Sequence, residues 1–154
     1  MDDTIREQII AAHTTRLSDI LIANVFEDFN TNIGQTVFRA VKDLETENLP
    51  FCVLWPSVEE ITSKYNKNVC TMVIRVEGLM EFGSINPSII QEKILGDLIW
   101  AMTNPDTEVS DLVEDVQYKT GGPADFPNAE DSVTSSFIEF EIRYDTLTGN
   151  PYQQ

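Results

Sequence analysis

The stretch from residue 136 to 144 constrains the fold more than any other part of this sequence. Apolar side chains occupy positions 138, 140, 142 and 144, while Glu139, Glu141 and Arg143 stand between them. A period of two places the apolar set on one face of a strand and the charged set on the other. The strand therefore covers a core on one side and meets water or a partner on the other. Because a loose edge near a chain end invites pairing with other chains, we expect an interior strand.

The charge of the chain excludes several classes of binding protein. The sequence holds 26 acidic and 10 basic residues among 154, a formal net charge of -16. This balance argues against sequence-independent nucleic-acid binding, which needs Lys and Arg to replace counterions, and against docking on anionic membranes. A hydrophobic content of 42% fits a globular chain. The length predicts a single domain over residues 1–154. Gly149 and Pro151 end regular structure after the last strand, which allows a flexible tail from about residue 147.

The sequence also bears on the compartment in which the chain folds. Its first residues are acidic where a signal peptide is basic, and no apolar run approaches the roughly 20 residues of a membrane span. We therefore expect folding in a cytoplasm and no membrane contact. Cys52 and Cys70 lie in apolar, strand-like runs. Free buried thiols are the first expectation for them, and a disulfide across a hairpin is the alternative.

Two stretches have helical periodicity. A Thr-x-x-Glu capping box that opens at Thr4 precedes an apolar stripe, which predicts a helix near residues 4–24. The Asn86-Pro87 pair predicts a second helix near residues 87–103. The only histidine, His13, falls within the first apolar stripe. We interpret it as a packed, hydrogen-bonded side chain, because general-base chemistry needs a partner and no nucleophile motif accompanies it.

The second helix is apolar on two sides. Ile89 and Trp100 lie away from its main apolar stripe, with Lys93 beside them. A helix of this kind is either deeply buried or docked against another subunit. In so small a domain docking is the preferred interpretation, since a large exposed aromatic side chain is an expected anchor of an interface. Ile89, Lys93 and Trp100 are therefore candidate residues of a subunit interface.

The remaining apolar runs predict strands. Residues 36–41 fit a short strand or an extended arm, and Gly78 interrupts the alternation of its strand, which suggests a bulge. The fold class is α+β, a mostly antiparallel sheet of about four strands packed by the two helices. The other strands are expected from Leu49 to Pro56, from Val69 to Phe82, around Leu112 to Thr120, and from Ser136 to Tyr144.

Charged residues gather in two places. Lys64 and Lys67 form a basic tip at the expected hairpin between the second and third runs. From Asp106 onward eleven acidic residues stand against two basic ones, so the C-terminal third is the most negative part of the chain. The residues assigned to a candidate acidic face, which would contact a partner or line a lumen, are Asp125, Glu130, Asp131, Glu139 and Glu141.

The sequence contains no strong signature of catalysis. Phosphate-binding glycine loops, a C-x-x-C pair, a His pair and a nucleophile elbow are all absent. The best enzyme candidate is the Glu139 and Glu141 pair, whose spacing along a strand resembles that of glycosidase carboxylates. Arg143 shares their face, however, and acid-base work needs one raised pKa in an apolar setting. We therefore expect no enzyme, no cofactor and no metal site, with a small hydrolase as the least favoured alternative.

The order of the elements along the chain is specific. An N-terminal amphipathic helix leads into Thr36-Val37-Phe38-Arg39, followed by Leu49-Pro50 and two strands. A Pro-started helix, Pro87 to Met102, and an acidic strand and loop come next. The chain closes on Phe140-x-Ile142-x-Tyr144-x-Thr146 and the Gly149-Asn150-Pro151 turn. This order resembles that of the tail terminator, or tail completion, proteins of long-tailed bacteriophages, and the likeness covers nearly the whole chain.

The resemblance implies a role in virion assembly. Its family forms hexameric rings of α+β subunits that cap the finished tail tube, stop its growth and join the tail to the neck below the head. The implied partners are the tail tube protein and a neck or head-completion protein, with DNA passing through the ring without specific binding. The location implied is the virion tail or neck, after synthesis in a host cytoplasm. Another neck or tube component, such as a stopper or adaptor, is the alternative. The family has no catalytic residues to carry over.

Overall fold

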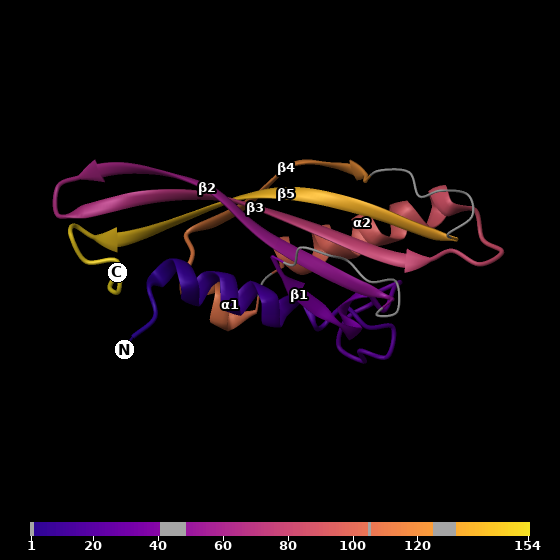
Figure 1. The fold of residues 1–154 in the computed structure, drawn as a ribbon. Helices are drawn as coiled ribbons and strands as arrows, with labels where there is room; N and C mark the ends of the chain where they lie inside the picture. Colours follow the sequence, from indigo (N-terminus) through magenta and orange to yellow (C-terminus); the bar gives the residue numbers. More distant parts are fainter. Residues whose placement is uncertain (1, 41–48, 105, 125–131) are drawn as a thin grey trace.

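The computed structural model of the protein describes residues 2–40, 49–104, 106–124 and 132–154. One five-stranded sheet runs through it in the order β1-β2-β3-β5-β4 (Figure 1). The β1–β2 pair is parallel and the other three pairs are antiparallel. The strands are β1 (Val37–Arg39), β2 (Phe51–Lys64), β3 (Lys67–Glu81), β4 (Asp115–Pro123) and β5 (Val133–Leu147).

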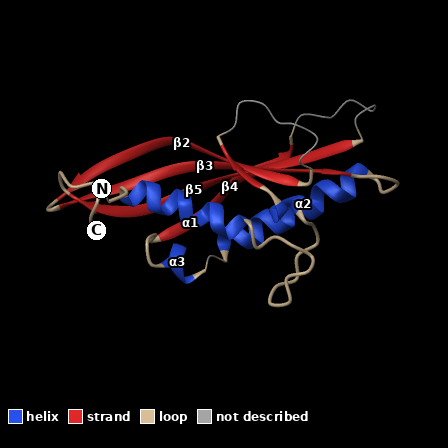
Figure 2. Cartoon of the chain, turned by 60° about the horizontal axis from the view of Figure 1, so that its bottom comes forward, coloured by secondary structure: helices blue, strands red, loops and turns tan. Residues whose placement is uncertain are grey.

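Helices cover one face of this sheet (Figure 2). The two long ones are α1 (Ile5–Leu17) and α2 (Pro87–Thr103), and the short ones are η1 (Ile33–Gln35) and α3 (Thr107–Ser110). The core lies between helices and sheet. Its fully buried members include Ile9 and Leu17 of α1, Ile94 and Leu98 of α2, and Phe140 of β5. The α+β class is therefore confirmed.

The sheet has five strands where about four were expected. The extra strand is β1, in the segment whose sequence fits either a short strand or an extended arm. The Cys52 amide donates to the Thr36 carbonyl and the Ala40 amide donates to the Leu54 carbonyl, so β2 holds the segment as a short parallel partner. The bounds of α2 agree with the predicted helix, and its Asn86 cap accepts a hydrogen bond from the Ser88 amide at 2.9 Å.

The alternating stretch near the C-terminus is an interior strand, as predicted. β5 pairs with β3 on one side and with β4 on the other. Ile138, Phe140 and Ile142 are fully buried on the helix-covered face, and Tyr144 is almost fully buried. Beyond β5 the chain turns back, and the Pro151 carbonyl accepts a hydrogen bond from the Ile5 amide at 2.9 Å.

The first helix is shorter than the predicted span of residues 4–24. It starts as expected, with the Thr4 hydroxyl accepting from the Glu7 amide, but it ends at Leu17. Ile20 and Phe29 remain buried although they lie in the following loop. The apolar period of the sequence extends past residue 17 because Ile20 reaches the same core from the loop, in a backbone conformation that is not helical.

Gly78 does not form the bulge that its position suggested. It pairs in register with Cys52 on one side and Ser136 on the other. A Cβ there would lie 2.7 Å from Ile94 Cγ2 and 2.8 Å from Ile33 Cδ1. The glycine is therefore required by the close approach of α2 and η1 to the sheet, rather than by an irregular backbone.

The bulges lie elsewhere, and β2 is longer than expected. Its register with β3 shifts between Pro56 and Glu59, and the strand continues past Pro56 to Lys64. Beyond Leu54, among the described residues, β2 pairs with β3 alone. Pro56 is tolerated within the strand because it lies along this open edge, where its missing N–H leaves no ladder bond unmade. At the other edge β4 begins at Asp115, later than expected, with a bulge between Tyr118 and Thr120.

Buried polar groups in the core are of two kinds. Cys52 lies opposite Gly78 and Cys70 lies opposite Ile61, so the two thiols do not meet across the hairpin and both are free. Burial raises the pKa of the Cys52 thiol to about 12. His13 is fully buried as expected, but neither ring nitrogen has a hydrogen-bond partner in the described part of the chain. Burial lowers its pKa to about 4, so the imidazole is neutral at physiological pH.

Candidate assembly surface

The second apolar side of α2 is exposed. Ile89 and Trp100 are each 52% exposed, and Lys93 also lies at the surface. Between them Gly96 faces open space, with nothing within 4 Å of where a Cβ would be. The structure thus brings the three predicted interface residues to one exposed side of a helix whose other side is in the core.

A loop from residue 18 to 32 extends this surface. It carries three exposed apolar side chains, Ile22, Val25 and Phe26, with exposed fractions of 59%, 86% and 92%. The loop connects to α2 through Glu27, which accepts a hydrogen bond from the Trp100 indole N–H at 3.2 Å. We call Ile22, Val25, Phe26 and Trp100 the loop patch. Exposed apolar side chains gathered on one loop and on the helix bonded to it are typical of protein–protein contact sites.

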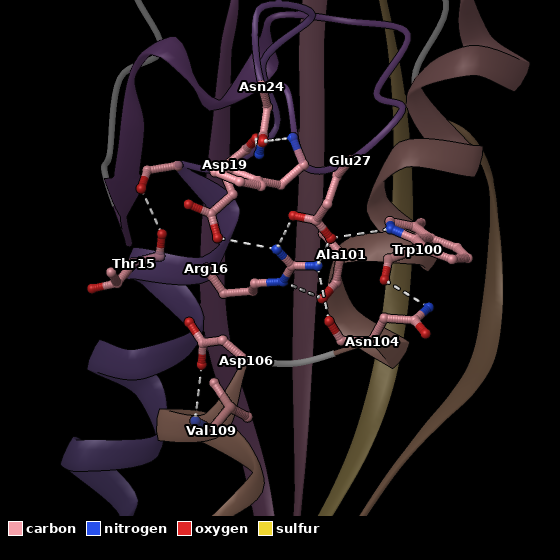
Figure 3. Close-up of polar contacts among 12 residues, drawn as sticks. Thr15, Arg16, Asp19, Asn24, Glu27, Trp100, Ala101, Asn104, Asp106 and Val109 are labelled. Carbon is pink, nitrogen blue, oxygen red and sulfur yellow. Dashed lines mark hydrogen bonds and ion pairs between the residues drawn. The ribbon is translucent and has the colours of Figure 1, made fainter.

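The base of the loop patch is held by one buried arginine (Figure 3). Arg16, at the end of α1, is only 3% exposed. Its Nε donates to the Ala101 carbonyl at 3.0 Å, and its Nη2 donates to the Asn104 carbonyl at 2.8 Å. Arg16 therefore satisfies carbonyls at the C-terminal end of α2, where a positive charge is also favoured by the helix dipole.

The same guanidinium also binds two acidic side chains of the 18–32 loop. Arg16 Nη1 and Nη2 donate to the two carboxylate oxygens of Glu27, each at 2.6 Å, and Nη1 also donates to Asp19 at 3.0 Å. A bidentate pair of this kind fixes orientation as well as position. The hydrogen bond from Arg16 lowers the pKa of Glu27, and the Trp100 indole acts in the same direction. One carboxylate thus links the end of α1, the loop and Trp100.

A second anchor holds the far end of the loop. The carboxylate of Asp97, on α2, is 2% exposed and accepts hydrogen bonds from the Thr31 amide and hydroxyl at 2.8 and 2.7 Å. The Asn30 amide also donates to it, at 3.0 Å to one oxygen and 3.1 Å to the other. The loop is therefore tied to α2 near both ends, so little conformational entropy remains to be lost when a partner binds it.

Sequence reasoning missed Arg16, Glu27 and Asp97. A signal was present for two of them, because Arg16 and Asp97 fall at positions of their helices' apolar stripes. A charged residue in a core stripe indicates a paired buried group. Nothing local distinguished Glu27 from the other surface acids, since its role depends on a partner 11 residues away in sequence.

The predicted basic tip lies at the turn between β2 and β3. Lys64 and Lys67 face each other across this turn, and Tyr65 between them is 93% exposed. Lys67 forms an ion pair with Asp145 of β5. Lys64 has no ion pair among the described residues. We call residues 64–67 the hairpin tip.

The predicted acidic face falls partly on β5. Glu139 lies 3.8 Å from Arg75 of β3, and Glu141 lies 3.7 Å from Lys119 of β4. Both carboxylates are half-buried on the sheet face opposite the helices. They therefore lie beside neighbouring bases on an open sheet face rather than in the apolar pocket that acid-base catalysis needs. The other candidates, Asp125, Glu130 and Asp131, lie outside the described residues.

An open hollow of about 310 Å³ lies at the start of α1, beside strands β2, β3 and β5 and the C-terminal turn. It is lined in part by Ile61, Tyr144 and Pro151. The Tyr144 hydroxyl donates to Glu59, which also lies 3.4 Å from Arg6. Its charged side chains, Arg6 and Glu59, are thus already paired with each other. Within the described ranges, no group of three or more His, Cys, Asp or Glu side chains is placed to hold a metal ion.

None of the described helices is long and apolar enough to cross a bilayer. No protein-family model matches the sequence, and no curated protein does. Among solved structures, a chain from the virion of a native gene transfer agent particle aligns over 92% of both chains, with a TM-score of 0.42 and 10% identity. A likeness of this degree does not establish a shared fold or function.

Proposed function

We propose that the protein is a structural subunit of a phage-like virion that acts as a tail terminator. In this role copies of the chain form a ring, a hexamer in the family that the sequence resembles. The ring caps the tail tube, ends its polymerisation and joins the tail to the neck. The observation that carries the assembly part of the proposal is the exposed apolar surface of α2 and the 18–32 loop, held in place by Arg16 and Asp97.

This surface has the composition of an interface rather than of a solvated face. Aromatic side chains in protein interfaces bury roughly 150–250 Å² each and dominate the binding energy. Phe26 and Trp100 offer two such side chains, with Val25 and Ile89 beside them. A closed ring needs heterologous contacts, in which this surface meets a different surface of the next copy. Ile89, Lys93 and Trp100 are assigned to that contact.

The charge of the chain suits a conduit for DNA. Phosphates are repelled by acids within a Debye length, about 8 Å at physiological salt. We assign the sheet face that carries Glu139 and Glu141 to the lumen, and we keep the sequence-based assignment of Asp125, Glu130 and Asp131 to the same acidic face. Arg75 and Lys119 lie beside Glu139 and Glu141 and offset part of their negative charge. The net charge of -16 on the whole chain still disfavours DNA binding.

The first test is the mass of the purified protein by light scattering, alone and mixed with tail tubes that lack their cap. The proposal predicts either a ring in solution or a monomer that becomes a ring only at tube ends. A monomer that does not bind tube ends contradicts the proposal. A protein that does not bind tubes but binds head connectors is a neck stopper or adaptor instead.

A substitution at Gly96 tests the assigned surface. Gly96→Arg places a long side chain in space that the isolated subunit leaves empty, and it replaces glycine by a better helix former. The variant should fold at least as stably as the natural chain but fail to assemble. Gly96→Ala is the matched control, which should be more stable by up to about 1 kcal/mol and assemble normally. Normal assembly of Gly96→Arg would remove this side of α2 from the interface.

A further inference from the structure

Two parts of this chain have complementary surfaces. The hairpin tip presents Tyr65, which is 93% exposed, and the loop patch presents Phe26, which is 92% exposed. Each aromatic ring stands at the end of a rigid element. The tip is a tight turn of a long two-stranded hairpin, and the loop is tied to α2 through Glu27 and Thr31.

The charges beside these rings are opposite. The 18–32 loop contains Asp19, Glu27 and Asp28 and no basic residue. Arg16 engages the first two, whereas exposed Asp28 has no ion pair in the described part of the chain. On the hairpin tip Lys67 is neutralised by Asp145, which leaves Lys64 as the unpaired charge. Each surface thus offers at least one exposed aromatic ring and one unpaired charge, and the two charges have opposite signs.

The two surfaces do not meet within one chain. The hairpin tip forms one end of the elongated molecule, and the 18–32 loop projects from the helix-covered side well away from it in both views (Figures 1 and 2). Contact between them therefore needs a second copy of the chain.

We infer that the hairpin tip of one copy docks on the loop patch of the next copy. Tyr65 packs against Phe26 and Trp100, and Lys64 pairs with Asp28. This inference deepens the proposed function, because it names the second surface that a ring contact requires. The contact is heterologous, so repeating it gives a ring if the rotation closes and a filament if it does not. A tip already ordered by strand pairing and a loop already anchored lose little entropy on docking.

Cross-linking of mixed chains tests the contact. One chain carries Ser63→Cys beside the tip and the other carries Ala23→Cys in the loop, and a flexible bis-maleimide is added to the mixture. Both positions are exposed, and Ser63→Cys disturbs only an exposed hydrogen bond to Asn68. The unsubstituted chain, with buried Cys52 and Cys70, gives the background. Random collision in an equimolar mixture gives twice as much 63–23 product as either the 63–63 or the 23–23 product, so we expect the 63–23 product to exceed each of the others by well over twofold. Yields close to this 1:2:1 ratio, or none above background, would overturn the inference.

A charge swap tests the named pair. Lys64→Glu and Asp28→Lys should each weaken the association about tenfold, because each places like charges opposite one another. The double variant, with both changes in every chain, should regain most of the affinity. Sedimentation over a range of protein concentrations at low salt gives the association constant of the natural chain, of the two single variants and of the double variant. A double variant that is weaker than either single variant contradicts the pairing, since two independent losses would then add.

The outcomes separate this inference from the function on which it rests. If the 63–23 product fails to form but the protein still caps tube ends, the tail role stands and the contact is wrong. If the product forms but tube ends are ignored, the contact stands and the terminator role is wrong. In the Lys64→Glu chain, loss of tube capping with the 63–23 product unchanged would leave the contact standing, refute the Lys64–Asp28 pair and assign Lys64 to a contact with the tube protein.

Discussion

Lowering the pH from about 7.5 to about 5 should destabilise this protein through a single side chain. His13 is the only histidine, it is fully buried, and burial lowers its pKa from 6.5 to about 4. A nearby carboxylate, Asp106, acts in the opposite direction but does not offset the loss of solvation. In the unfolded chain the imidazole becomes protonated below about pH 6.5, while in the folded chain it stays neutral down to about pH 4.

The sign and the size follow from proton linkage. Between pH 6.5 and 4 the unfolded state binds more protons, so stability is present above pH 6.5 and is lost as the pH falls. Over the interval from pH 7.5 to 5 the two pKa values correspond to a loss of about 2 kcal/mol. For a domain of this size that lowers the midpoint of thermal unfolding by roughly 4–8 °C. Glu7 and Glu27, whose pKa values are lowered by arginine partners, add their losses mainly below pH 5.

Two measurements check the argument. Urea unfolding at a series of pH values gives the change of the free energy of unfolding with pH. NMR titration of the His13 imidazole gives its pKa directly. His13→Leu is the control, because it keeps an apolar side chain of similar size and removes the titrating group. We expect its stability to be nearly independent of pH over the same interval. A measured pKa near 6.5, or a His13→Leu protein that retains the pH dependence, would refute the reasoning.

Three further predictions concern packing and the anchor of the loop. Gly34→Ala should destabilise the protein by about 3 kcal/mol in urea unfolding, because its Cβ would lie 2.4 Å from a backbone carbonyl oxygen; an effect equal to that of Gly96→Ala would contradict this. Gly78→Ala should cost about 2 kcal/mol, somewhat less than Gly34→Ala, since the atoms in its way belong to side chains that can shift; a larger cost than Gly34→Ala would show that they cannot. Glu27→Gln should cost about 2 kcal/mol by removing the bidentate charged partner of the buried guanidinium and leaving it with Asp19, and should speed hydrogen exchange of the 18–32 amides. Unchanged exchange there would mean that the anchor does not order the loop.

Local sequence patterns predicted the elements that depend on neighbouring residues. The Thr4 cap, the Asn86-Pro87 start and the alternation at 138–144 were all confirmed, because capping and side-chain facing follow from spacing along one element. The end of α1 was misjudged for the opposite reason. Ile20 keeps the period of the helix while its burial is achieved from a loop, and periodicity does not distinguish the two.

The candidate site was predictable only in part. Ile89 and Trp100 could be assigned to a second helix face because their spacing alone separates them from the core stripe. The loop patch could not be predicted, since Ile22 and Phe26 become a surface only when the loop is folded against α2. Gly78 shows the same limit. A glycine is needed there because Ile94 of α2 packs against that position, and no pattern of neighbouring residues in the sequence contains this contact.

The sequence by itself determined the α+β class, the helix starts, the buried face of β5 and the acidity that disfavours DNA binding. Each of these follows from interactions within a few residues or from summed charge. The tertiary structure alone decided the parallel β1–β2 pair, the length of α1 and the grip of Arg16 on Glu27. These depend on groups that the fold brings together from distant positions. A buried guanidinium is stable only where carboxylates and carbonyls converge on it, and only the folded chain supplies that convergence.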